Sequence, residues 1–362
     1  MSNVVIMFIY NSIYKDGVTI KMEWVKTEEL KPNLILAENI FLIFGSLYIP
    51  KGTSLTQNMI DKMDLIGIEG AYVSIGLPER KIDDTDKSYA RMDKKFYNIY
   101  NRLLNGQRVV IEDINEVVDD IISTVTNDHN LLMNINKLKS RDSYTYRHMM
   151  NVAIICSFIG RGLKIPEEEV KKLTLSGLLH DIGKRVIPLE ILNKPSALSK
   201  AEFEIIKRHP ISSYEICKTI EGLSEDVICS VIAHHEREDG TGYPFGLAYD
   251  KIPKVAKIIA VADVYDAITT DRIYRSKETS YRALSILKEE SHDKLSKEIV
   301  QLFTGELIKY LLGNIVRLSN GETVQVVSID KDKPHMPMVI TEKGRYDLST
   351  HSSLYIKEVL MV

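Results

Sequence analysis

The pattern of hydrophobic and polar positions first predicts a small β-rich unit. Residues 28–76 alternate apolar runs of four to six residues with turn residues such as Pro32, Gly45 and Gly70, which is typical of short strands. We assign residues 22–82 to this lead-in domain, a structural or dimerising module or a ligand sensor, and residues 1–21 to an N-terminal extension. Met22 offers a second translation start.

The pattern then changes to a helical period. Over 84–104 and 112–138 apolar residues recur every three or four positions, which predicts amphipathic helices in a helical connector at 83–140. Residues 141–313 are almost wholly helical in pattern and form the next predicted domain. We expect its helices at 143–161, 166–180, 199–209, 212–220, 224–235, 252–270, 280–290 and 297–312, with a turn at Pro210.

After Gly313 the apolar residues alternate with polar ones. Asn320-Gly321 and Lys343-Gly344 are hairpin-type turns, so residues 314–362 are predicted to form a small β-barrel or meander. The fold class is therefore mainly α: a helical bundle flanked by two small β-rich units.

Composition narrows the choice of function. The chain has 362 residues, 44% hydrophobic and 27% charged, with a formal net charge of -3, which is ordinary for a globular protein and does not favour binding to DNA or RNA polymers. The apolar run at 4–10 is too short to span a membrane, so we expect a cytoplasmic protein. Cys156, Cys217 and Cys229 form no CxxC pair, and we expect buried, reduced thiols.

Candidate metal ligands recur through the helical region. A lone histidine usually only packs, but several imidazoles and carboxylates on the inner faces of successive helices favour a metal site. Such donors suit iron, manganese or zinc better than calcium. The seven candidates are His148, His180, Asp181, His209, His234, His235 and Asp263.

Three segments carry a resemblance to a known family. They are LLHDIGK, HHEREDGTGYP and DVYDAITTDRIYR, in this order. Over roughly residues 137–313 the chain resembles the HD-GYP family, bacterial phosphodiesterases that hydrolyse cyclic di-GMP. The resemblance implies a helical HD-GYP bundle with a metal-dependent hydrolytic site.

The resemblance also implies how the ligands divide. His148, His180 and Asp263 would hold one metal, while His209, His234 and His235 hold the other. Asp181 would bridge them, and a bridging hydroxide would attack the phosphodiester. Iron or manganese is the expected metal. Some members of the family bind a third metal through a glutamate where this chain has Tyr144, so we expect a binuclear site and linear pGpG as the chief product.

Lys184 and the residues around it are the expected substrate contacts. The resemblance implies that Lys184 binds the scissile phosphate and assists the leaving oxygen, and that the glycine-tyrosine-proline loop contacts the substrate. Asp266, one turn after Asp263, is counted with this site and could also orient a ligand or Lys184. The remaining expected contacts are Gly242, Tyr243, Pro244, Arg272 and Arg275.

Other functions stay open on the sequence alone. The substrate could be another cyclic dinucleotide such as cGAMP, or a linear dinucleotide, because metal ions bind the phosphate and do not distinguish the bases. The chain could also be a catalytically weak cyclic di-GMP receptor or scaffold, or, least in keeping with the ligands, a helical scaffold without metal. A homodimer and signalling-protein partners are left open.

Overall fold

The computed structural model describes residues 22–41 without 33, 47–49, 53, 55–74, 84–127, 144–270 without 195, 277–341, 344–350 and 353–361. Its contacts divide the chain into two units. One contains residues up to 87, and the other contains 88–341 and most of the rest. Each unit is described by itself below.

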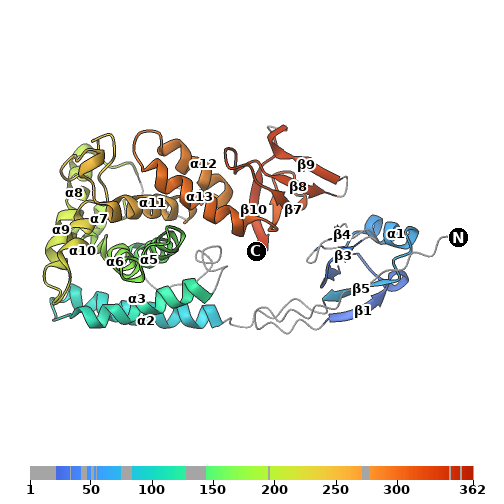
Figure 1. The fold of residues 1–362 in the computed structure, drawn as a ribbon, viewed down its shortest axis with the longest axis horizontal. Coiled ribbons are helices and arrows are strands. Elements are labelled where there is room, and N and C mark those ends of the chain that lie inside the picture. Colours follow the sequence, from blue (N-terminus) through green and yellow to red (C-terminus); the bar gives the residue numbers. More distant parts are fainter. Residues whose placement is uncertain are drawn as a thin grey trace. The chain divides into compact units, whose positions relative to one another are not determined.

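The N-terminal unit is a small sheet packed against one helix (Figure 1). Strands β1 and β5 pair antiparallel, with Trp24 opposite Tyr72, and β2 pairs with the other side of β5. The predicted β-rich unit is confirmed. Its elements are β1 (Met22–Lys26), β2 (Ile35–Leu36), β3 (Ile40–Phe41), β4 (Leu47–Ile49), α1 (Gln57–Leu65) and β5 (Gly70–Ser74).

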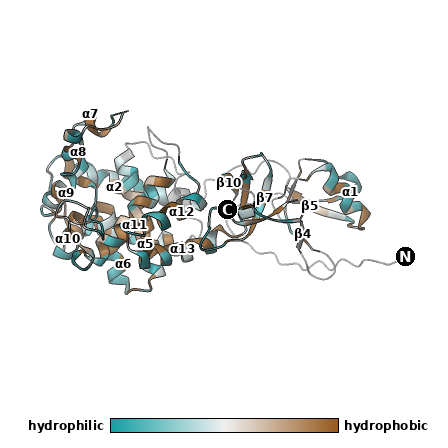
Figure 2. Cartoon of the chain, turned by 90° about the horizontal axis from the view of Figure 1, so that it is seen from above, coloured by the Kyte–Doolittle hydropathy of each residue, from teal (hydrophilic) through white to brown (hydrophobic). Residues whose placement is uncertain are grey.

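The second unit is a helical bundle. Helix α5 packs against α6 and α11, and Figure 2 shows hydrophobic residues along α5 and α11. Its helices are α2 (Asp84–Leu104), α3 (Ile111–Asn127), α5 (Tyr144–Gly162), α6 (Glu167–Leu179), α7 (Leu189–Leu192), α8 (Lys200–Ile206), α9 (His209–Cys217), α10 (Glu225–Ile232), α11 (Lys254–Thr269), α12 (Ser280–Glu290) and α13 (Lys297–Leu311), with the 3-10 turns η3 (Ile182–Val186) and η4 (Tyr249–Lys251).

Local sequence explains where helices α8 and α9 begin. The Ser199 Oγ atom accepts a hydrogen bond from Glu202 N at 3.2 Å, and Glu202 Oε2 accepts one from Ser199 N at 2.7 Å, so a capping box starts α8. The predicted turn at Pro210 is wrong, because α9 begins at His209 and Pro210 lies in its first turn. A proline there loses no helical hydrogen bond.

The C-terminal strands form a five-stranded sheet in the order β10-β6-β7-β8-β9. Neighbours in the chain pair from β6 to β9, and β10 returns beside β6, which confirms the predicted meander. Val316, Val326 and Val339 are buried in the same hydrophobic cluster as Phe303 of α13. The strands are β6 (Ile315–Leu318), β7 (Thr323–Ser328), β8 (Met338–Thr341), β9 (Gly344–Asp347) and β10 (Ile356–Met361).

The cysteines differ in their exposure. Cys156 and Cys217 are buried, and burial raises the pKa of both thiols, that of Cys217 to about 12. The prediction that Cys229 is buried is wrong, because α10 buries Val227 and Ile228 and turns the next position to the surface. Among the described residues, no helix has the length and hydrophobicity that would let it cross a membrane.

Candidate metal centre

The structure brings all seven candidate ligands together. His148 comes from α5, His180 and Asp181 from the end of α6, His209 from the start of α9, and Asp263 from α11. His234 and His235 follow the last turn of α10. Two sets have ligand atoms within 4.8 Å of one another: Asp181, His209, His234 and His235, and then His148, His180 and Asp263.

Asp181 lies between the two sets. Its Oδ2 atom is 3.3 Å from His148 Nε2 and 3.2 Å from His180 Nε2. Its Oδ1 atom is 3.1 Å from His209 Nε2 and 3.7 Å from His234 Nε2. Each carboxylate oxygen therefore faces one set of histidines, which is the arrangement that a carboxylate shared by two cations requires.

The far side of three imidazoles is fixed by backbone carbonyls. Each Nδ1 atom lies within hydrogen-bond distance of the carbonyl oxygen three residues earlier. Donation from Nδ1 leaves Nε2 as the lone-pair nitrogen, and that nitrogen points toward Asp181. The pairs are His180 with Gly177 at 2.8 Å, His209 with Ile206 at 2.8 Å and His234 with Val231 at 2.6 Å.

Asp266 fixes the Nδ1 side of His148, as the backbone carbonyls do for the other three imidazoles. Its Oδ2 atom is 2.6 Å from His148 Nδ1, and its Oδ1 atom accepts hydrogen bonds from Asn151 Nδ2 at 2.7 Å and Thr270 Oγ1 at 3.0 Å. Asp266 has no exposed surface. It therefore lies behind a candidate ligand, and the expected direct contact between Asp266 and substrate does not fit this position.

The positions of Asn151 and Thr270 beside Asp266 were not predicted from the sequence. Both could have been found from helix geometry, since Asn151 is three residues after His148 and Thr270 is four residues after Asp266. Residues at these spacings lie on one face of a helix.

Two buried polar atoms at the centre fit a cation. His180 Nε2 and Asp181 Oδ1 are buried and make no hydrogen bond, which is costly unless another partner satisfies them. A metal ion held by these atoms would supply that partner. The donor set of imidazole nitrogens and carboxylate oxygens is suited to a transition metal.

Charge at the site also favours metal binding. Burial, together with neighbouring imidazoles, lowers the pKa of His234 and His235 well below the usual value, so both keep a lone pair at neutral pH. Burial alone would raise the pKa of Asp181, but His180 and Lys184 hold it well below its usual range. The centre therefore offers the neutral imidazoles of His234 and His235 and the ionised carboxylate of Asp181, which are the forms that bind metals. Burial lowers the pKa of His148, but hydrogen bonds to Asp181, Asp263 and Asp266 outweigh burial and raise it well above its usual value.

Lys184 lies beside the shared carboxylate. It is on η3, and its Nζ atom donates a hydrogen bond to Asp181 Oδ2. The preceding Gly183 packs directly on α9: a Cβ atom there would lie 2.3 Å from both His209 O and Ser213 N. Gly183 N also donates to Ser213 Oγ at 2.8 Å. The absence of a side chain at Gly183 thus lets η3 and α9 approach closely.

Glu236 holds the glycine-tyrosine-proline loop. This buried carboxylate accepts hydrogen bonds from Phe245 N at 2.7 Å and Leu247 N at 2.8 Å. Gly242 is needed where the loop doubles back, because a Cβ atom there would lie 2.4 Å from Arg237 N.

Tyr243 connects this loop to the ligands. Its ring lies on the ring of His235, with centroids 4.6 Å apart and planes tilted by 31°. Pro244 follows it in the same loop. Arg272 and Arg275, the other expected substrate contacts, lie outside the described residues.

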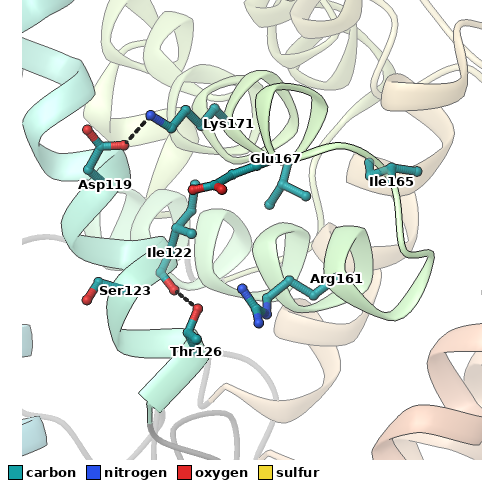
Figure 3. A pocket seen from close by; sticks show the side chains of 9 residues that line it. Asp119, Ile122, Ser123, Thr126, Arg161, Ile165, Glu167 and Lys171 are labelled. Atoms are coloured by element: carbon teal, nitrogen blue, oxygen red, sulfur yellow. Dashed lines mark hydrogen bonds and ion pairs between the residues drawn. The ribbon is translucent and has the colours of Figure 1, made fainter.

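A separate pocket opens between α3, the end of α5 and the start of α6 (Figure 3). It has a volume of about 670 Å³ and contains none of the seven candidate ligands. An ion pair of 3.0 Å between Lys171 and Asp119 lies at its edge, and both side chains are partly exposed. The histidine–aspartate cluster therefore lies outside this pocket.

Known proteins are similar to this chain in sequence and fold. Residues 131–299 match the family model of the HD domain. The chain is 37% identical to the cyclic di-GMP phosphodiesterase PA4108 of Pseudomonas aeruginosa, over 70% of this chain and 60% of that protein. It is 32% identical to the cyclic di-GMP phosphodiesterase PdeB of Borreliella burgdorferi, over 54% and 52% of the two chains. It is 38% identical to the 3'3'-cGAMP-specific phosphodiesterase 1 of Vibrio cholerae, over 43% and 36%.

The histidine–aspartate cluster lies within the residues that match the HD-domain model. The fold matches that of the HDG"Y"P protein Bd1817 from Bdellovibrio bacteriovorus with a TM-score of 0.52 at 17% identity, over 80% of this chain and 100% of that one. The chain is thus similar to these phosphodiesterases in sequence and to Bd1817 in fold. It covers 60% or less of the length of each of the three relatives named above.

Proposed function

We propose that the chain is a metal-dependent phosphodiesterase that hydrolyses cyclic di-GMP, chiefly to linear pGpG. The observation that supports this most is Asp181, whose two oxygens face two separate sets of histidines. Two-metal sites of this kind hydrolyse phosphodiesters. Tyr144, in place of a third-metal carboxylate, supports pGpG as the main product.

The two sets of ligands would each hold one divalent cation, iron or manganese. His148, His180 and Asp263 would hold the first cation. His209, His234 and His235 would hold the second, and Asp181 would bind both cations. When bound, such cations neutralise charge on the phosphodiester and lower the pKa of the attacking water, so that it reacts as hydroxide.

The remaining residues would bind and orient. Lys184, already beside Asp181, would place its ammonium group against the scissile phosphate and stabilise the charge that develops on the leaving oxygen. Asp266 would hold the His148 ring in its binding orientation. Tyr243 would form the wall of the site on the His235 side.

A second substrate has support from the relatives. Vibrio cholerae proteins named as 3'3'-cGAMP-specific phosphodiesterases match this chain at 38%, 34% and 29% identity. Because metals bind the phosphate and not the base, cGAMP is the second candidate. A catalytically weak receptor remains the alternative from another class.

One experiment separates these functions. Protein purified without oxygen is analysed for metal and then incubated with cyclic di-GMP or cGAMP, and the products are separated by chromatography. We expect about two metals per chain, faster loss of cyclic di-GMP and accumulation of pGpG. Two metals with turnover of cGAMP alone would favour the second candidate. Tight binding of cyclic di-GMP without turnover would favour the receptor.

Asp266→Asn tests the hydrogen bond behind His148. An amide keeps the size of the side chain but accepts more weakly from the imidazole, and loss of such a partner weakens metal binding about 10- to 100-fold. Competition with a chelator measures the change. Asp250→Asn is the matched control, because Asp250 is an exposed residue of η4 paired with Lys251. Equal metal affinity in Asp266→Asn and the parent would contradict the role of Asp266.

A further inference from the structure

Aromatic rings lead outward from the metal centre. Next to His235, the ring of Tyr243 is half-buried, and the ring of Phe203 lies beyond it with centroids 6.5 Å apart and planes at 78°. Phe203 is 46% exposed. The series thus runs from a candidate ligand to a phenyl ring at the surface.

The exposure of Phe203 does not come from a loose end of the chain. Phe203 lies within α8, whose first turn is fixed by the capping box of Ser199 and by an ion pair of 2.7 Å between Lys194 and Glu202. The Lys207 Nζ atom lies 5.4 Å from the Phe203 ring centroid. The Phe203 ring is therefore held by an ordered helix, partly in solvent and next to Tyr243.

We propose that Phe203 is a substrate-binding residue, on which one purine base of the cyclic dinucleotide stacks while a phosphate occupies the metal centre. This inference rests on the proposed function. Aromatic side chains stack on bases through the π face that every base carries. Lys207 beside the ring forms an ion pair with Glu204 of the same helix, so the proposal rests on the aromatic face alone.

The test compares variants at this position in the complete, metal-loaded chain. Phe203→Ala is expected to raise KM for cyclic di-GMP about tenfold, within the range measured for loss of one stacked base, and to change kcat less than twofold. Phe203→Tyr keeps an aromatic face and is expected to retain the parent KM. Phe203→Leu keeps an apolar side chain without that face and is expected to behave like Phe203→Ala.

Ile205→Ala is the matched control, because Ile205 is 37% exposed on the same helix and has no place in the series of rings. A second measurement uses fluorescence. The parent has one tryptophan, Trp24 in the N-terminal unit, so Phe203→Trp adds a reporter whose emission a stacked purine quenches. We expect quenching by cyclic di-GMP in Phe203→Trp and none in the parent.

The outcomes separate this inference from the proposed function. An active parent with the same KM in Phe203→Ala, or with Phe203→Leu equal to the parent, would overturn base stacking and leave the proposed function standing. A metal-loaded parent that turns over no cyclic dinucleotide would overturn the proposed function and the inference with it.

Discussion

Asp181→Asn is expected to remove phosphodiesterase activity almost completely. The amide keeps the shape of the side chain, but it is neutral and presents an NH₂ group to one of the two sets of histidines that the carboxylate oxygens now face. It therefore cannot be shared by two cations. Loss of a shared cation removes several kcal/mol of transition-state stabilisation, so we expect kcat to fall at least about a thousandfold.

Metal content and thermal unfolding check the same variant. Metal that binds only the folded state stabilises it, so a chelator should lower the unfolding temperature of the parent and have little effect on Asp181→Asn. Asp113→Asn is the control, because Asp113 on α3 pairs with Arg102 at 2.8 Å and belongs to neither ligand set. Full metal content and parent-like kcat in Asp181→Asn would refute a shared carboxylate.

The candidate ligands could be predicted because their signal is local. Adjacent pairs such as His180-Asp181 and His234-His235 stand out in the sequence, and the segments that hold them are recognisable as one family. The division of the ligands into two sets came from the family resemblance and not from spacing. The set membership found in the structure agrees with it, with Asp181 close to both.

Helix spacing could have placed Asn151 and Thr270 on the faces of their helices that carry His148 and Asp266, but the hydrogen bonds that join distant segments around the ligands could not be predicted. The hydrogen bond between Asn151 and Asp266 joins α5 to α11. The Glu236 carboxylate accepts hydrogen bonds from backbone N–H groups nine and eleven residues later, and no local pattern in the sequence shows this. In the sequence, Phe203 is an ordinary apolar residue of a helix, because its neighbour Tyr243 comes from a distant segment.

The fold was predictable where hydrophobic periodicity is strong. The predicted ranges for α2 and α12 agree with the observed helices at both ends. Pro210 was misread because proline interrupts a helix but is also favoured in its first turn, and the pattern alone does not show where the first turn falls. Cys229 was misread because a short apolar helix does not reveal which face is outside.

Gly183→Ala is expected to damage both stability and activity. The added methyl carbon would lie 2.3 Å from His209 O and from Ser213 N, and backbone atoms of a helix cannot turn aside as a flexible side chain can. Relief of this clash must separate η3 from α9 and weaken the hydrogen bond from Gly183 to Ser213. Overpacking of this kind costs about 1–3 kcal/mol.

The activity should fall further than the stability loss alone explains. Gly183 follows Asp181 by two residues and contacts the backbone of His209, so a displacement at this contact moves two candidate ligands relative to each other. A shift of about 1 Å in a catalytic arrangement can cost about a hundredfold in rate. We therefore expect kcat for cyclic di-GMP to drop about a hundredfold in protein that is still folded at the assay temperature.

Gly305→Ala is the control for the general effect of replacing a glycine by alanine. Gly305 lies inside α13, where an added Cβ atom meets nothing within 4 Å, so the methyl group should favour the helix by about 0.5–1 kcal/mol. Thermal unfolding and kcat are measured for both variants. If Gly183→Ala unfolds at the parent temperature with parent activity, close packing of η3 on α9 does not position the ligands, and the placement of Asp181 against His209 must depend on α6 and α9 alone.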